Sequence, residues 1–188
     1  MTGDGPPPPG PVALRSLART DFPLLGTWLG APHVARWWSD PGDPASLEAR
    51  YGPTVDGDDP TEVFVATVGG EPVGLVQRYR LADEPGWVVA LGPAGVPPDA
   101  FGIDYLVGDP ARTGRGLGPA MIEALVADSW RRYPECPTCV VAVHADNRRS
   151  WRALERSGFA RAWAGRLDTD DPADGGPHVV YLRRRPAG

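Results

Sequence analysis

Three glycines at alternate positions, Gly114, Gly116 and Gly118, follow an apolar segment and precede a helical pattern. Because glycine lacks a Cβ atom, such a segment can bring its backbone N–H groups close to a ligand. The helix that begins here adds the unpaired amides of its first turn and the positive end of its dipole. Together these groups suit a phosphate or a pyrophosphate. A tight strand-to-helix turn without a ligand would use the same residues, so the glycines alone leave both interpretations open.

The spacing of the glycines excludes two common nucleotide-binding motifs. No Gly-Lys-Ser/Thr follows them, and the chain contains no lysine, so the segment is not a P-loop. The order G-x-G-x-G also differs from the dinucleotide-binding fingerprint, and no repeated strand–helix–strand unit surrounds it.

Length and composition predict a folded domain. The 188 residues, with 41% hydrophobic side chains and seven tryptophans, can bury a core, and we expect one domain over residues 11–188. The Pro/Gly-rich segment 1–10 is predicted to be disordered. No segment is apolar enough to span a bilayer and no signal peptide is evident, so we expect a cytoplasmic protein without a membrane partner. The net charge of −5 disfavours a nucleic-acid partner and permits a cationic one.

Carboxylates and cysteines gather in short segments. Seven carboxylates and one arginine lie in residues 40–62, and four aspartates lie in residues 168–174. These segments are either solvated acidic loops or surfaces that attract a cation. Cys136 and Cys139 form a C-x-x-C pair without a second ligand pair and without the strand–C-x-x-C–helix order of a redox motif. We therefore expect reduced thiols and no metal site.

Hydrophobic periodicity predicts which elements hold these segments, in the order β-α-α-β-β-β-α-β-α-β-β. The glycine turn connects a central strand to a long helix, and residues 81–100 are expected to form a Pro/Gly-rich loop. The expected strands cover residues 12–17, 62–68, 73–80, 101–108, 138–144, 159–166 and 178–183.

Two segments resemble the core motifs of the GCN5-related N-acetyltransferase (GNAT) family. One is the strand, glycine turn and helix described above. The other is the run from Asn147 to Phe159, which matches the pattern N-x-x-S/A-x-x-x-x-E-x-x-G-F. The resemblance, which extends over residues 11–184, implies an α/β (α+β) GNAT fold. Its mixed, mostly antiparallel and twisted sheet would have about seven strands, splayed between the fourth and fifth and flanked by about four helices.

Within that family the chain is most similar to aminoglycoside 6'-N-acetyltransferases. Residues 33–38, 70–77, 102–104 and 174–181 carry this likeness, and siderophore-type lysine N-acyltransferases share several of these segments. The resemblance implies an enzyme that transfers acetyl from acetyl-CoA to an amino group of a cationic small molecule. The leading acceptor is the 6'-amino group of an aminoglycoside, attacked directly in a ternary complex by a monomeric or homodimeric enzyme without a metal.

The resemblance also implies where acetyl-CoA binds. Its pyrophosphate is expected on the backbone donors of residues 113–118, with Arg112 and Arg115 adding charge-assisted contacts. The pantetheine arm is expected to pair with the backbone of residues 106–108, and a backbone N–H near Leu106 to stabilise the oxyanion. The expected cofactor-binding residues are Leu106, Val107, Gly108, Arg112, Thr113, Gly114, Arg115, Gly116, Leu117, Gly118, Asn147 and Ser150.

Asp104 is the expected general base, because alternation along the central strand points it to one face near the thioester. His144 is an alternative base. Aromatic side chains are expected to wall the acceptor site, and further carboxylates to make it anionic. The expected substrate-binding residues are Trp37, Gln77, Tyr79, Trp87, Asp104, Tyr105, Asp146 and Asp174.

The chain departs from the family pattern at two positions. Thr113 stands where the family usually has Gln or Arg, and Leu154 stands where it often has the tyrosine that protonates the leaving thiolate. A coenzyme A thiolate can leave without a strong acid, so solvent is the favoured proton source and Tyr105 is the alternative.

Other activities remain open at this stage. The acceptor is alternatively a lysine or hydroxylysine in siderophore assembly, although that group typically carries a histidine near the position of Asp104. Acetylation of a protein N-terminus is a further alternative. A non-catalytic module that senses acyl-CoA is the alternative of a different class, since the usual tyrosine is missing.

Overall fold

The computed structural model describes residues 10–169 and 175–186. The segment predicted to be disordered, residues 1–10, therefore lies outside the described residues except for Gly10. Asp174, one of the expected substrate-binding residues, also lies outside them.

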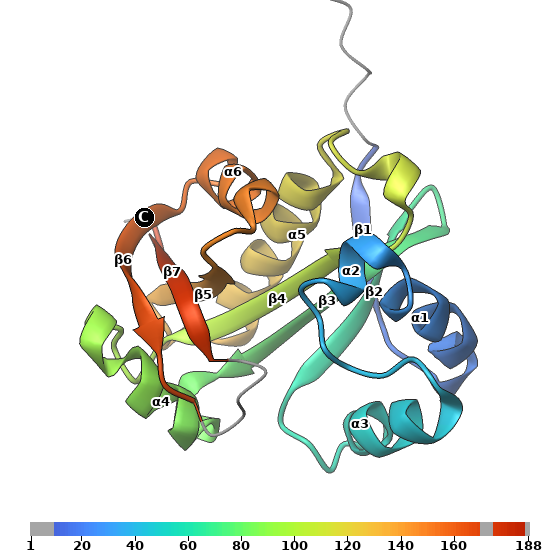
Figure 1. The fold of residues 1–188 in the computed structure, drawn as a ribbon, viewed down its shortest axis with the longest axis horizontal. Helices are drawn as coiled ribbons and strands as arrows, with labels where there is room; N and C mark the ends of the chain where they lie inside the picture. The colour runs from blue at the N-terminus through green and yellow to red at the C-terminus, as the bar shows by residue number, and fades with distance from the viewer. Residues whose placement is uncertain (1–9, 170–174, 187–188) are drawn as a thin grey trace, which may run out of the picture.

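Seven strands form one sheet in the order β1-β2-β3-β4-β5-β7-β6 (Figure 1). All neighbouring strands are antiparallel except β4 and β5, which are parallel. This arrangement confirms the predicted mixed sheet. The strands are β1 (Val12–Ser16), β2 (Glu62–Val68), β3 (Glu71–Arg80), β4 (Phe101–Val107), β5 (Thr138–His144), β6 (Ala160–Leu167) and β7 (Gly176–Arg184).

The sheet opens between β4 and β5. These strands pair only at Phe101 with Cys139 and at Gly102 with Val140. On its other side, β4 stays paired with β3 along its whole length. One backbone edge of β4, over residues 103–107, therefore has no strand partner in the described part of the chain, which confirms the predicted splay.

Within residues 10–169 and 175–186, six α-helices surround the sheet, two more than the four or so predicted. One of the additional helices lies in residues 81–100, so the prediction of a loop there is wrong. Pro85 occupies the first turn of this helix, where its missing N–H breaks no hydrogen bond, and Leu81 and Leu91 anchor the segment in a small buried cluster. The helices are α1 (Phe22–Leu29), α2 (Pro32–Ala35), α3 (Pro44–Asp56), α4 (Pro85–Leu91), α5 (Leu117–Arg132) and α6 (Arg148–Arg156).

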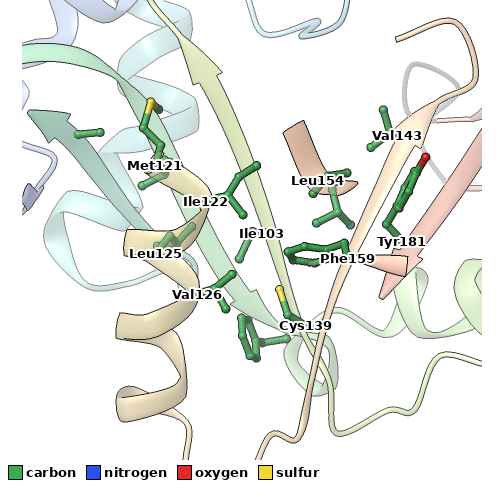
Figure 2. Close-up of a cluster of buried hydrophobic side chains, with 14 of the residues drawn as sticks. Ile103, Met121, Ile122, Leu125, Val126, Cys139, Val143, Leu154, Phe159 and Tyr181 are labelled. Carbon is green, nitrogen blue, oxygen red and sulfur yellow. The ribbon is translucent and has the colours of Figure 1, made fainter. Parts of the chain in front are cut away.

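The helices α5 and α6 pack against the sheet through one large hydrophobic core (Figure 2). Met121, Ile122 and Leu125 recur at helical spacing in α5 and are fully buried beside Ile103 of β4. Leu154 of α6 is also fully buried in this core. The residue that replaces the family's usual tyrosine is therefore a core side chain, which explains why an apolar residue fits there.

A second core holds α1, α2 and α3 on the opposite face of the sheet. Strand alternation divides β3 between the two cores, since Leu75 packs with the second and Val76 with the first. Leu106 of β4 also belongs to the second core. Both faces of the central strands are thus covered, and the splayed edge of β4 lies between α2 and α6.

Candidate active site

Two cavities meet beside the splayed edge of β4. The first, about 810 Å³, is bounded by α2, the end of β4, the glycine turn and α6; we call it the glycine-turn cavity. The second, about 530 Å³, is bounded by β3, β4, β5 and the start of α4; we call it the Asp104 cavity. Six residues line both cavities and form the passage between them: Arg36, Trp37, Trp38, Tyr105, Asn147 and Ser150.

The glycine turn presents unpaired backbone donors. Gly114 and Gly116 have φ angles of 76° and 83°, in the left-handed region that glycine adopts without strain. In the part of the chain that the structure describes, the amides of residues 114–118 have no recorded acceptor. The Thr113 amide differs, because it donates to the Pro110 carbonyl at 3.2 Å. The available donors therefore begin at Gly114, one residue later than predicted.

The expected cofactor-binding residues divide into two groups. Eight line the glycine-turn cavity: Leu106, Val107, Thr113, Gly114, Gly116, Gly118, Asn147 and Ser150. Four do not. Gly108 lies against the Trp28 ring, Leu117 is buried in the first core, Arg115 is exposed, and Arg112 lies 3.8 Å from the Asp109 carboxylate.

The direction of the β4 amides narrows the choice of the N–H expected near Leu106. The Gly108 N–H donates to the Val73 carbonyl at 3.0 Å. Because N–H groups alternate in direction along a strand, the Leu106 amide also points toward β3. The amides of Tyr105 and Val107 point into the splay instead. An oxyanion donor near Leu106 therefore has to be one of these two neighbours and not Leu106 itself.

His33 of α2 contacts the same edge of β4. Its Nε2 donates to the Val107 carbonyl at 2.9 Å, since a carbonyl oxygen can only accept. Its Nδ1 is buried and has no hydrogen-bond partner among the described residues. The sequence assigned His33 no role, yet it lines the cavity where the pantetheine arm is expected.

Asp104 lies in the second cavity and is held by its strand neighbour. Gln77 stands opposite Asp104 in the β3–β4 register, and its Nε2 donates to Asp104 Oδ2 at 2.9 Å. Gln77 is only 7% exposed, and its Oε1 is buried without a partner among the described residues. The pair thus offers a cation or a hydroxyl both a carboxylate and an unused carbonyl acceptor.

Tyr105 and Ser150 lie in the passage between the cavities. The Tyr105 hydroxyl and Ser150 Oγ are 2.6 Å apart. Burial raises the pKa of the Tyr105 phenol; the Ser150 hydrogen bond opposes this, and the Asp104 charge adds to it. Asn147 is the N-cap of α6, and its Oδ1 accepts from the Ser150 N–H at 3.2 Å. Tyr105 therefore stays a neutral hydroxyl at the point where the two cavities join.

Most of the expected substrate-binding residues line one cavity. Six of them line the Asp104 cavity: Trp37, Gln77, Tyr79, Trp87, Asp104 and Tyr105. Asp146 lines the glycine-turn cavity instead, so the structure does not bring it to the expected acceptor wall. His144 does line the Asp104 cavity, but its Nδ1 accepts from the Asp146 N–H at 3.2 Å. The neutral ring therefore carries its proton on Nε2 and presents a donor, which disfavours His144 as the base.

Two carboxylates in the Asp104 cavity were not assigned from the sequence. Asp40 accepts from Trp38 Nε1 at 2.9 Å and from the Tyr51 hydroxyl at 2.6 Å. Glu84 lies at the start of α4, and burial raises its pKa, with the Asp59 charge adding to the effect. The helix α4 brings Glu84 to the cavity, and the unrecognised helix is the reason that the sequence did not reveal it.

Three further observations concern metal-ligating groups, thiols and membrane-spanning helices. Among the described residues, no group of three or more His, Cys, Asp or Glu side chains is arranged to hold a metal ion. Cys136 and Cys139 are both buried free thiols, and burial raises the pKa of each. No helix in residues 10–169 and 175–186 has the length and apolar character needed to cross a membrane.

Comparison with known sequences gives matches over most of the chain. The model of the acetyltransferase (GNAT) domain family matches residues 18–167. The aminoglycoside N(6')-acetyltransferases type 1 of Klebsiella pneumoniae and Serratia marcescens are each 31% identical to this chain over 180 residues. The matched region covers 94% of this chain and 84% of each relative.

Solved structures of a similar protein contain both a coenzyme A compound and an aminoglycoside. AAC(6')-Ib in complex with paromomycin and acetyl-CoA superposes with a TM-score of 0.78 at 29% identity, covering 93% of this chain and 94% of that one. AAC(6')-Ib in complex with coenzyme A and kanamycin gives a TM-score of 0.77 at 30% identity, covering 93% and 95%. The fold described above is thus shared with a protein whose solved structures contain acetyl-CoA or coenzyme A together with an aminoglycoside.

Proposed function

Because this chain belongs to the GNAT acetyltransferase family, we propose that it transfers acetyl from acetyl-CoA to an amine of an aminoglycoside. The 6'-amino group is the leading position, as the names of the relatives suggest. Acetyl transfer to nitrogen is the activity of the family, and the acceptor is what the proposal adds.

One observation carries the proposal: two cavities of opposite character meet at Tyr105. The glycine-turn cavity offers free backbone amides to phosphates. The Asp104 cavity offers the carboxylates of Asp40, Glu84 and Asp104 to a cation, beside aromatic walls on which a sugar ring can stack. A polyanionic donor and a polycationic acceptor would therefore meet at the passage.

The donor half of the reaction uses the backbone. The amides of residues 114–118 would hold the pyrophosphate, and the pantetheine arm would extend along the open edge of β4 toward Tyr105. In that position the Tyr105 or Val107 amide lies near the thioester carbonyl and can stabilise the oxyanion of the tetrahedral intermediate. We therefore assign the oxyanion donor to one of these two amides.

The acceptor half uses Asp104. The ammonium group of the acceptor would be drawn in by the carboxylates, and Asp104 would take its proton, aided by desolvation in the cavity. The neutral nitrogen then attacks the thioester carbon, forming the C–N bond; this nitrogen loses its second proton to solvent, and the C–S bond breaks as the tetrahedral intermediate collapses. The coenzyme A thiolate finally takes a proton from solvent or from the Tyr105 hydroxyl, since Leu154 is buried in the core.

The first test is acetyl transfer by the purified protein. It is incubated with acetyl-CoA and, separately, kanamycin-type aminoglycosides, lysine derivatives and a peptide N-terminus, and thiol release is measured. We expect turnover with the aminoglycosides. Turnover only with lysine derivatives or with the peptide would assign the corresponding alternative acceptor. Binding of coenzyme A without thiol release from any acceptor would instead support the acyl-CoA sensor.

The second test is the Asp104→Asn variant. The amide keeps the shape of the side chain and can still accept from Gln77, but it cannot take a proton. We expect kcat to fall about 100-fold or more, while the affinity for coenzyme A is unchanged. Asp99→Asn is the matched control, because Asp99 is exposed and lines neither cavity. Wild-type turnover by Asp104→Asn would remove Asp104 from the mechanism.

The remaining assignments follow from this proposal. We treat residues 11–188 as one acetyltransferase domain, a reading supported by the single sheet. We place the enzyme in the cytoplasm, where acetyl-CoA is available, with no nucleic-acid, membrane or metal partner. A monomer or a homodimer is expected, and light scattering after gel filtration measures which one forms.

A further inference from the structure

His144, at the end of β5, presents a hydrogen-bond donor on the wall of the Asp104 cavity. Its Nδ1 accepts from the Asp146 N–H at 3.2 Å, so the proton of the neutral ring lies on Nε2. In the part of the chain that the structure describes, Nε2 has no hydrogen-bond partner, and it is not a buried atom. The proposed transfer of acetyl does not use this donor.

His144 lies on the same face of the sheet as Asp104. Val143 packs in the first core, so His144, the next residue of β5, points to the other face. Asp104 points to that face as well, because its neighbour Tyr105 packs against the first core. The strands β4 and β5 diverge along this part of their length, so the two side chains flank the opening between them. A ligand that fills the cavity would therefore meet both.

Three contacts fix the His144 ring before a ligand binds. The centroid of the Trp37 ring lies 5.5 Å from that of His144. His178 occupies the facing position of β7, and the centroid of its ring lies 5.7 Å away, edge to face. The third contact is the hydrogen bond from the Asp146 N–H. A donor that is already fixed in direction loses little freedom on binding, which favours its use in recognition.

The Asp104 cavity therefore offers two kinds of hydrogen-bonding group. The carboxylates of Asp40, Glu84 and Asp104 suit ammonium groups, which can only donate. The neutral imidazole N–H of His144 cannot bind an ammonium group, because both are donors, but it can bind an oxygen. In an amino sugar, hydroxyl and ring oxygens lie close to the amino groups, whereas a linear polyamine has no oxygen.

We propose that His144 donates a hydrogen bond from Nε2 to an oxygen of the acceptor, so that the protein selects amino sugars over polyamines that lack oxygen. The inference rests on the proposed function in one respect, namely that the acceptor binds in the Asp104 cavity. It makes His144 a determinant of acceptor specificity and gives it no part in proton transfer.

Two variants separate this role from the contact that His144 makes in the turn after β5. In His144→Asn, Oδ1 lies near the position of Nδ1 and can still accept from the Asp146 N–H, but no group replaces Nε2. In His144→Gln, the longer side chain brings an amide N–H near the position of Nε2, and the acceptor of the turn is lost. The first variant removes the proposed contact, and the second restores it.

The test measures, by calorimetry, the affinity of each protein for kanamycin A and for spermine in the presence of saturating coenzyme A. The two compounds carry the same number of amino groups, and only kanamycin A carries oxygens. We expect the wild type to bind kanamycin A more tightly. His144→Asn should weaken its binding about tenfold, as the loss of one hydrogen bond would, and leave spermine binding unchanged. His144→Gln should keep part of the preference for kanamycin A.

The affinity for coenzyme A is the structural control. The turn from β5 leads into Asn147, which lines both cavities, so damage to this turn should weaken coenzyme A binding. We expect His144→Asn to bind coenzyme A as the wild type does. Circular dichroism checks that each variant is folded.

Each outcome supports or overturns the inference. It is overturned if the wild type binds spermine as tightly as kanamycin A, or if His144→Asn changes the affinity for both compounds equally or for neither. A loss accompanied by weaker coenzyme A binding also overturns it, since the role of His144 would then be structural. These outcomes leave acetyl transfer as proposed. Failure of the wild type to bind kanamycin A overturns the proposed acceptor as well.

Discussion

Glu84 occupies an environment that opposes its negative charge. Burial raises the pKa of its carboxyl group, and the charges of Asp59 and Asp83 raise it further, although Arg50 acts against them. A cation bound in the Asp104 cavity would favour the ionised form. Binding of a polyamine should therefore release a proton from Glu84, and the affinity for the acceptor should depend on pH.

This coupling gives a prediction for the Glu84→Gln variant. In the wild type, KM for the acceptor should rise as the pH falls through the raised pKa, because the protonated carboxyl no longer attracts the cation. Glu84→Gln should raise KM about tenfold at neutral pH and flatten this dependence. Initial rates between pH 5 and 8 measure KM for the acceptor. If KM of the variant depended on pH as it does in the wild type, this would contradict the role of Glu84.

Glu71→Gln is the control for that experiment. Glu71 is exposed in the β2–β3 hairpin and lines neither cavity. Its substitution therefore removes the same charge away from the acceptor site. Its pH profile should match that of the wild type.

At the level of single residues, the sequence predicted side chains better than backbone directions. Asp104 follows from strand alternation, and Gly114 and Gly116 follow from their spacing. The sequence indicated an oxyanion donor near Leu106 but not which amide faces the splay, because the direction of an N–H depends on the pairing register. That register is fixed here by the bond from Gly108 to Val73, a contact between segments about 35 residues apart that no local pattern reveals.

The turn between β4 and α5 depends on the backbone conformation of its glycines. Gly114 has a φ of 76°, and a Cβ atom added there would meet nothing within 4 Å. Gly57, which ends α3, has a φ of 83° and is equally unobstructed. Alanine at either position is strained by about 1–2 kcal/mol without a steric clash.

The two glycines therefore make a matched pair of variants. Gly114→Ala and Gly57→Ala should lose similar free energy of unfolding in urea titrations. Only Gly114→Ala should also weaken coenzyme A binding, by about tenfold, because relief of the strain turns the adjoining amides away from the phosphates. Equal coenzyme A affinity in the two variants would show that the turn does not hold the ligand.

At the level of elements, periodicity predicted all seven strands and the helices α5 and α6. These elements alternate clearly or carry a wide apolar face, so local pattern and tertiary packing agree. The helix α4 was missed because its seven residues lie among prolines and glycines that usually indicate a loop. The helix is stabilised because Leu91, and Leu81 just before the helix, pack in one cluster with side chains of β5 and β7. A prediction from local sequence does not include such contacts.

A buried ion network joins three elements of the whole molecule. Arg78 of β3, whose side chain is 4% exposed, pairs with Glu62 of β2 at 2.7 Å and with Asp128 of α5 at 2.6 Å. Burial acts against the charge of Glu62, but hydrogen bonds from Arg78 and Tyr133 outweigh it and lower the pKa of Glu62. The sheet and its longest helix are thus held together partly by charge.

The network predicts how stability responds to Arg78→Met. Removing the guanidinium leaves two carboxylates that are about one-third exposed, so we expect a loss of about 2–3 kcal/mol at pH 7. Because the pKa of Glu62 is lowered on folding, its stabilisation is present above the ordinary value of 4.5 and is lost as the pH falls further. Urea unfolding at pH 7 and pH 4 should therefore show a smaller acid effect in the variant.

Arg131→Met provides the comparison for Arg78→Met. Arg131 pairs with the same Asp128, but its side chain is 72% exposed. It should change the free energy of unfolding by less than about 1 kcal/mol. A similar loss of free energy of unfolding in both variants would mean that the burial of Arg78 does not strengthen its ion pairs.

The divergence of β4 and β5 leaves unused hydrogen-bonding groups in the middle of a sheet. On a protein's surface, a strand edge of this kind promotes aggregation by recruiting strands from other molecules. Here α2 and α6 stand on either side of the opening, and a neighbouring chain would have to pass between them. The molecule can therefore keep a strand edge ready for a flexible, peptide-like guest while remaining protected from pairing with copies of itself.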